Sequence, residues 1–191
     1  MRFPPVRRHV LQGLGLLLML GWLWACPAAA QPIELAQLQT SRREGALTLE
    51  FATRITLPKA VEEALQHGVP VYFVAEAQLK RLRWYWRDER VARVSRQWRI
   101  AYQPLTSTWR VGLGGLNQSH ATLDDALASV TRSAGWKIAD LAQLDPDSRY
   151  YLEFSYRLDT SQLPSPMQIG LGGQGDWTIG VERTLRVGAE P

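Results

Sequence analysis

The chain has 191 residues, of which 46% are hydrophobic and 21% are charged. This length and balance suit one globular domain and exclude a disordered or fibrous chain. The formal net charge of +4 depends largely on Arg2, Arg7 and Arg8, so the rest of the chain is nearly neutral. The excess positive charge is therefore mostly a targeting feature and does not by itself indicate a nucleic-acid-binding protein.

Residues 1–30 have the features of a signal peptide. The beginning is positive and lacks acidic residues, and the apolar stretch 11–25 is shorter than a membrane-spanning helix. Residues 28–30 are three alanines, which suit a cleavage site for signal peptidase. We therefore expect cleavage after Ala30, a periplasmic or secreted protein, and no transmembrane helix once the leader is removed.

The single cysteine leaves an alternative open. Residues 23–26 resemble a lipobox, so the protein could instead be a lipoprotein anchored at Cys26. If the leader is cleaved after Ala30, the mature chain contains no cysteine, which excludes disulfides and thiolate chemistry. In either case we expect a single β-rich domain over residues 31–191.

The first part of this domain predicts two strands and a helix. A weak strand is expected at 33–40, followed by a polar turn at 41–45. A second strand is expected at 47–57, where apolar and polar residues alternate. A short helix should begin at Pro58 and end before Gly68, and it must pack on a sheet because so short a helix is unstable alone.

Residues 69–113 predict an antiparallel meander. Apolar residues occupy odd positions over 71–79 and then even positions at Leu82, Trp84 and Trp86. Such a change of phase requires an extra residue, so we expect a β-bulge near Lys80 and Arg81. A turn at 87–90 should lead into a strand that buries Val94, Trp98, Ile100 and Tyr102, and a second turn should lead into a strand at 109–113.

The remaining third contains further breaks, a helix and strands. Residues 114–120 are predicted to form a loop, and Thr122 should cap a helix that ends at Gly135. A strand is expected at 150–159. After breaks rich in Pro and Gly at 164–166 and 170–175, residues 177–187 should form the last strand.

One spacing suggests the fold. Leu144, Pro146 and Tyr150 resemble the tyrosine corner of fibronectin type III and immunoglobulin-like sandwiches, in which the tyrosine hydroxyl bonds to the preceding loop. We therefore predict a mainly β protein, an antiparallel β-sandwich of the immunoglobulin or fibronectin-III type with two short capping helices. The alternative is an α+β fold with an open or barrel-like antiparallel sheet.

The sequence shows no convincing catalytic constellation. His67 ends a predicted helix, and His120 lies beside Ser119 in a predicted loop without a nucleophile elbow. Asp124 and Asp125 stand where helix-capping charges are usual. The glycine runs lack the lysine and helix of a phosphate-binding loop. We therefore expect no catalytic residue, no cofactor and no metal site.

The basic and aromatic hairpin over residues 80–110 is the candidate binding face. Its guanidinium groups and rings could bind an envelope protein or an anionic envelope glycan or lipid. The structural alternative is that the arginines stack on neighbouring rings and keep the sheet soluble. Nucleic acid is not expected outside the cytoplasm. The candidate residues are Arg81, Arg83, Trp84, Tyr85, Trp86, Arg87, Arg90, Arg93 and Arg99.

These features favour a non-enzymatic interaction module. The alternative is an enzyme acting on an envelope glycan or lipid, with His120 and either Asp124 or Asp125 as the acid and base.

Several short segments carry a family resemblance. Residues 83–88 (RWYWRD), 102–106 (YQPLT) and 109–111 (WRV), with the loop at 114–116 and the segment 123–127, resemble an exported bacterial family known only as a domain of unknown function. The resemblance implies a signal peptide and one domain, with no assigned reaction and no functional residues. Members are often encoded beside a membrane sensor kinase of the nitrogen-regulation type, which implies an accessory role in envelope sensing.

Overall fold

The computed structural model describes residues 32–85, 87–163 and 177–188. The expected leader with Cys26, the side chain of Trp86 and the expected breaks at 164–166 and 170–175 lie outside the described residues. Among the described residues, no helix combines the length and apolar character required to cross a lipid bilayer.

The elements follow one another as β1 (Ile33–Arg43), β2 (Ala46–Ile55), α2 (Lys59–Gln66), β3 (Val71–Arg81), β4 (Glu89–Gln103), β5 (Thr108–Leu113), β6 (Leu116–His120), α3 (Leu123–Val130), β7 (Arg132–Asp140), η2 (Leu141–Gln143), β8 (Tyr150–Asp159), η3 (Thr160–Gln162) and β9 (Gly180–Val187).

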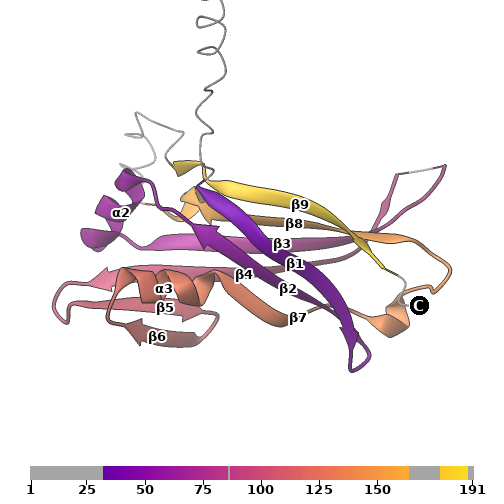
Figure 1. Cartoon of the computed structure of the whole chain (residues 1–191), viewed down its shortest axis with the longest axis horizontal. Helices are drawn as coiled ribbons and strands as arrows, with labels where there is room; N and C mark the ends of the chain where they lie inside the picture. The colour runs from indigo at the N-terminus through magenta and orange to yellow at the C-terminus, as the bar shows by residue number, and fades with distance from the viewer. Residues whose placement is uncertain (1–31, 86, 164–176, 189–191) are drawn as a thin grey trace, which may run out of the picture. The chain divides into compact units, whose positions relative to one another are not determined.

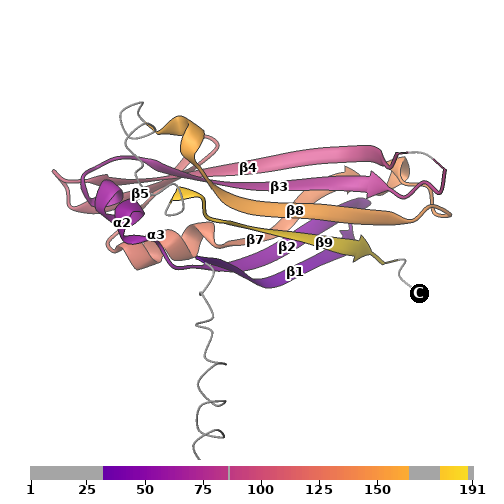
Figure 2. The same cartoon turned by 90° about the horizontal axis from the view of Figure 1, so that it is seen from above.

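The strands form two antiparallel sheets, which are stacked in Figures 1 and 2. The smaller sheet has the order β1-β2-β7, and the larger has the order β6-β5-β4-β3-β8-β9. In an immunoglobulin-like sandwich, strand B lies between A and E, strand C lies between C′ and F, and G lies beside F. Here β2 lies between β1 and β7 as strand B does between A and E. Likewise β3 lies between β4 and β8 as strand C does between C′ and F, and β9 lies beside β8 as G does beside F. The predicted immunoglobulin-like sandwich is therefore confirmed. In place of a fourth strand in the smaller sheet, β6 extends the larger one.

An aromatic cluster joins the two sheets in the core. The ring of Phe51 on β2 lies 4.9 Å from that of Phe154 and 5.8 Å from that of Tyr156, both on β8. It also meets Trp98 on β4 and Trp136 on β7 edge-on, at 6.2 and 6.3 Å. Since the described residues include no cysteine, these ring contacts hold the sheets together where antibody domains have a disulfide.

The tyrosine corner is present as predicted. Tyr150 begins β8, its ring is only 8% exposed, and its hydroxyl accepts a hydrogen bond from the backbone N–H of Asp145 at 2.9 Å. The predicted inward face of β8 is buried from Tyr150 to Leu158 at every second residue. The contact fixes the crossing from β7 to β8, where the chain passes between the sheets.

The two short helices also begin where predicted. Pro58 caps α2, and Gly68 follows its end with a positive φ of 81°. The side chain of Thr122 accepts a hydrogen bond from the backbone N–H of Asp125 at the beginning of α3. Each helix buries its apolar side against the sandwich, which compensates for its lack of length.

Two strands contradict the sequence-based expectations. The predicted loop at 114–120 is a hairpin in which Gly114 and Gly115 form the turn and β6 forms an exposed edge strand. The predicted helix ends at Val130 rather than at Gly135, and β7 follows it at once. Gly135 lies at a bulge in β7, where two residues oppose one residue of β2, and its φ is positive at 61°. The final strand, β9, begins at Gly180, three residues later than expected.

Candidate interaction site

The connection between β3 and β4 is a loop at the end of the sandwich farthest from α2 (Figures 1 and 2). We define residues 82–88 as the β3–β4 loop. The sequence predicted that β3 would continue through this stretch, with its apolar residues at even positions such as Leu82 and Trp84. Instead β3 ends at Arg81, and the exposed fractions of Leu82, Trp84 and Tyr85 are 53%, 92% and 68%.

The position of the bulge explains the difference. The pairing of β3 with β4 shifts between Leu79 and Lys80, close to the predicted place. The extra residue, however, is Val91 in β4, while the pairing of β3 with β8 continues unbroken. Because β3 contains no additional residue, its phase does not change and the apolar residues beyond it have no place in the core.

Asp88 holds the β3–β4 loop in position. One carboxylate oxygen accepts a hydrogen bond from the backbone N–H of Arg83 at 3.2 Å, and the other accepts one from the hydroxyl of Tyr151 on β8 at 2.5 Å. The Tyr151 hydroxyl lowers the pKa of Asp88, and the carboxylate in turn raises the pKa of Tyr151 to about 12. The backbone N–H of Leu82 also donates to the carbonyl of Arg149 at 2.9 Å. Both sides of the loop are thus attached to the sandwich.

Two of the candidate arginines reinforce this attachment. Arg83 forms an ion pair with Glu89 at 2.5 Å, and Arg81 approaches the same carboxylate at 3.7 Å. The guanidinium of Arg81 also lies over the ring of Tyr150, 5.6 Å from its centre. These contacts attach both guanidinium groups to neighbouring parts of the protein.

The tip of the loop combines aromatic and basic side chains. The rings of Trp84 and Tyr85 pack edge to face with their centres 4.9 Å apart. Arg87 and Arg90 are exposed, and neither forms an ion pair with any of the described residues. The tip is therefore an exposed aromatic pair with unpaired positive charge beside it.

The adjoining sheet adds to this charge. On the outer face of the larger sheet, Arg90 stands opposite Lys80, Lys80 opposite Tyr151, and Tyr151 opposite Arg186. Lys80 is paired with Glu153 at 2.7 Å. We call this the basic row, and it crosses the sheet immediately behind the β3–β4 loop.

The other candidate residues lie elsewhere. Arg93 donates to Glu76 at 2.8 Å on the outer face of the sheet, and Arg99 is exposed farther from the loop. Trp98 is buried in the core at 3% exposure. Arg96 also turns inward, stacks on Trp136 at 5.2 Å and donates to Ser133, and burial lowers its pKa. The hairpin is thus divided between a structural part and the exposed end at the β3–β4 loop.

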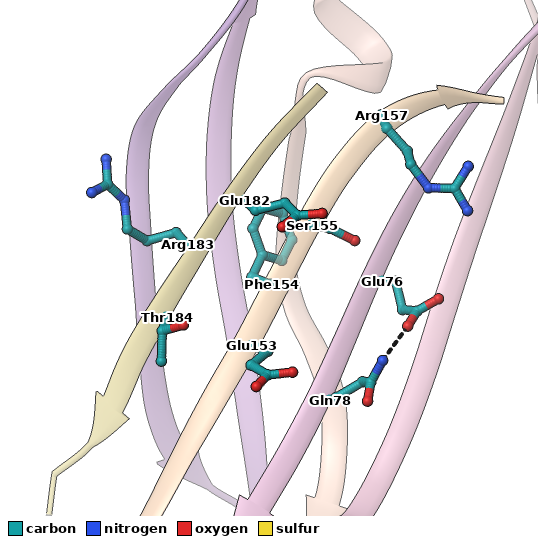
Figure 3. A pocket seen from close by; sticks show the side chains of 9 residues that line it. All are labelled: Glu76, Gln78, Glu153, Phe154, Ser155, Arg157, Glu182, Arg183 and Thr184. Atoms are coloured by element: carbon teal, nitrogen blue, oxygen red, sulfur yellow. Dashed lines mark hydrogen bonds between the residues drawn. The ribbon is translucent and has the colours of Figure 1, made fainter. Parts of the chain in front are cut away.

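A shallow polar depression on the outer face of β3, β8 and β9 was not foreseen from the sequence (Figure 3). Its volume is about 490 Å³, and Glu76, Glu153 and Glu182 line it with Gln78 and Ser155. Gln78 donates to Glu76, whose pKa is lowered chiefly by the hydrogen bond from Arg93. Glu76 and Glu153 already have basic partners, so we assign no ligand to this depression. The sequence indicated this polar surface only through the polar residues at every second position of β3, β8 and β9.

The structure does not assemble the alternative acid–base pair. His120 lies on β6 opposite Trp109, and its buried Nε2 has no hydrogen-bond partner. Asp125 is engaged by Thr122 at the beginning of α3, where Oδ2 accepts from the threonine hydroxyl at 2.7 Å. Within the described ranges, no hydrogen bond or ion pair joins His120 to a carboxylate, and no group of three or more His, Cys, Asp or Glu gathers as metal ligands would.

A comparison with known protein families identifies the chain. The model of a family described as a domain of unknown function (DUF4390) matches residues 30–186. The chain belongs to this family, which agrees with the resemblance found in its sequence. No curated protein and no solved structure matched the chain.

Proposed function

We propose that this DUF4390 protein is a non-enzymatic interaction module of the bacterial envelope, and that it docks through the β3–β4 loop. The observation that carries the proposal is the exposed pair of Trp84 and Tyr85 on a loop whose backbone is attached by polar contacts. Tryptophan, tyrosine and arginine are the residues that most often dominate binding energy at interfaces.

Protein stability gives no reason for this exposure. Large apolar side chains lower the free energy of folding when they are buried, and a loop of polar residues could connect β3 to β4 without exposing them. Local rules of folding are most often broken at functional sites. The contacts of Asp88 with Arg83 and Tyr151 add to the argument, because they hold these two residues of the loop in place before a partner arrives.

The chemistry of the tip indicates the charge of its partner. Arg87, Arg90 and the basic row face solvent together, while Asp88 and Glu89 are occupied by contacts within the protein. A partner that has negative charge beside an apolar area would complement both the positive charge and the exposed rings of the tip. The expected gene neighbourhood of the family makes an envelope sensor the first protein partner to test.

The proposal is tested by chemical crosslinking in the native envelope, followed by purification of the tagged protein. The double variant Trp84→Ala/Tyr85→Ala should lose its crosslinked partner. The matched control is Leu105→Ala, since Leu105 is fully exposed in the β4–β5 loop at the opposite end of the sandwich. If the double variant retained its partners to the same extent as the control, the β3–β4 loop would not be the docking element.

A further inference from the structure

We propose that the β3–β4 loop binds the surface of an anionic phospholipid bilayer. This inference rests on the function proposed above and specifies its partner. It draws on the exposed rings of the tip, the charge around them and the two backbone hydrogen bonds at the beginning of the loop.

The apolar tip is carried by a single loop at the end of the sandwich (Figure 1). Among the described residues of the loop, the exposed hydrophobic side chains are Leu82, Trp84 and Tyr85. A stable protein interface usually buries about 800 Å² on each partner, more than a few side chains on one loop supply. The same side chains suit a membrane surface, because tryptophan and tyrosine favour the boundary between headgroups and hydrocarbon, where one end of the ring is apolar and the other is wet.

The positive charge lies where headgroup phosphates would meet the protein. Arg87 belongs to the loop itself, and Arg90 and Arg186 lie in the basic row behind it. Of the neighbouring acidic groups, Glu89 is paired with Arg83, and Asp88 is hydrogen-bonded to Tyr151 on the sandwich side of the loop and keeps its charge. Each arginine close to an anionic leaflet increases binding by about fivefold.

Two backbone N–H groups at the beginning of the loop are already bonded within the protein. The N–H of Leu82 is bonded to the carbonyl of Arg149, and the N–H of Arg83 to Asp88. Unbonded N–H groups would oppose entry into the bilayer interface. The N–H groups of Leu82 and Arg83 therefore do not oppose the entry of the neighbouring rings of Trp84 and Tyr85 into the headgroup region.

The test is cosedimentation with lipid vesicles. The protein is purified after export and carries Cys26→Ser, which removes any site for an acyl chain. Vesicles of mixed phosphatidylglycerol and phosphatidylcholine are compared with vesicles of phosphatidylcholine alone. We expect at least tenfold tighter binding to the anionic vesicles, and we expect added salt to weaken it.

Two variants separate the aromatic and basic contributions. Trp84→Ala/Tyr85→Ala should weaken binding by about tenfold or more, because two interfacial rings are removed. Arg87→Glu/Arg90→Glu should weaken it by at least about 25-fold, because two attractive charges are lost and reversed. The matched controls, Leu105→Ala and Arg110→Glu, change exposed residues away from the loop and should bind as the parent does. The urea midpoints should be unchanged throughout, which shows that each variant is folded.

The outcomes distinguish this inference from the function on which it rests. If anionic vesicles do not bind, or bind equally well after both loop variants, the lipid proposal is wrong. If crosslinking in the envelope still depends on Trp84 and Tyr85 in that case, the loop docks on a protein and the proposed function stands. If neither vesicle binding nor crosslinking depends on the loop, both proposals fail.

Discussion

The tyrosine corner offers a test of the fold that can be worked out from a single hydrogen bond. The variant Tyr150→Phe removes only the hydroxyl that accepts from the backbone N–H of Asp145. The ring stays buried, but the amide of Asp145 loses its partner in a half-buried position. A buried donor without a partner costs about 1–3 kcal/mol, and we expect the lower half of this range because water can reach part of the site.

The measurement is the midpoint of unfolding in urea. A domain of this size should have a slope of about 1–3 kcal/mol per molar urea, so the midpoint of Tyr150→Phe should fall by roughly 0.5–1 M without a change of slope. Total stabilities of about 5–15 kcal/mol make such a shift readily measurable.

Tyr85→Phe is the matched control. Tyr85 is largely exposed and its hydroxyl forms no hydrogen bond with the described residues, so its loss should cost less than about 0.5 kcal/mol. Tyr151→Phe would be a poorer control, because the Tyr151 hydroxyl binds Asp88. Equal midpoints for Tyr150→Phe and Tyr85→Phe would show that the corner does not stabilise the sandwich.

Three further perturbations test other parts of the structure. Phe51→Ala removes the centre of the aromatic cluster and should cost about 3–5 kcal/mol in urea unfolding, whereas a loss below roughly 1 kcal/mol would contradict the central role of this ring. Thr122→Ala removes the cap of α3 and should cost about 1 kcal/mol, and an unchanged midpoint would mean that the cap is unimportant. Asp88→Ala should return the pKa of Tyr151 from about 12 toward 10.0, because the carboxylate no longer opposes ionisation. This is visible in a titration of tyrosinate absorbance, and an unchanged titration would argue against the contact. Since the pKa is raised on folding, the stabilisation from this contact should be complete below pH 10 and lost as the pH rises through about 12.

The core strands were predictable because their residues alternate without interruption. The odd positions of β3 from Val71 to Leu79 and the inward positions of β8 are buried as the pattern required. The spacing before Tyr150 located the crossing between the sheets, and Thr122 located α3. In each case local chemistry and tertiary packing favour the same structure.

The two missed strands had weaker or interrupted signals. The five residues of β6 are mostly exposed at the edge of a sheet, so they lack an apolar alternation, and only the pair Gly114-Gly115 indicated a hairpin. In β7 the bulge at Gly135 breaks the alternation between Ser133 and Trp136. A glycine near the end of a helical pattern is easily taken for its stop, which is how β7 was missed.

The candidate site shows the opposite kind of failure. Apolar residues at alternate positions normally indicate a strand, and on that basis the sequence predicted that Leu82 and Trp84 continue β3. Their assignment required a bulge in β3, but the extra residue lies in β4. Sequence could identify the concentration of arginine and aromatic residues, but it could not show which of them the strands would leave in solvent.

The most direct test of the account is photocrosslinking from the tip of the loop in living cells. A photoreactive amino acid replaces Trp84 in one variant and Leu105 in another, and both positions are highly exposed. We expect the probe at position 84 to label an envelope component, either lipid or protein. The probe at position 105 should not label that component. Equal labelling from both positions, or none from position 84, would contradict the claim that the β3–β4 loop is the docking element.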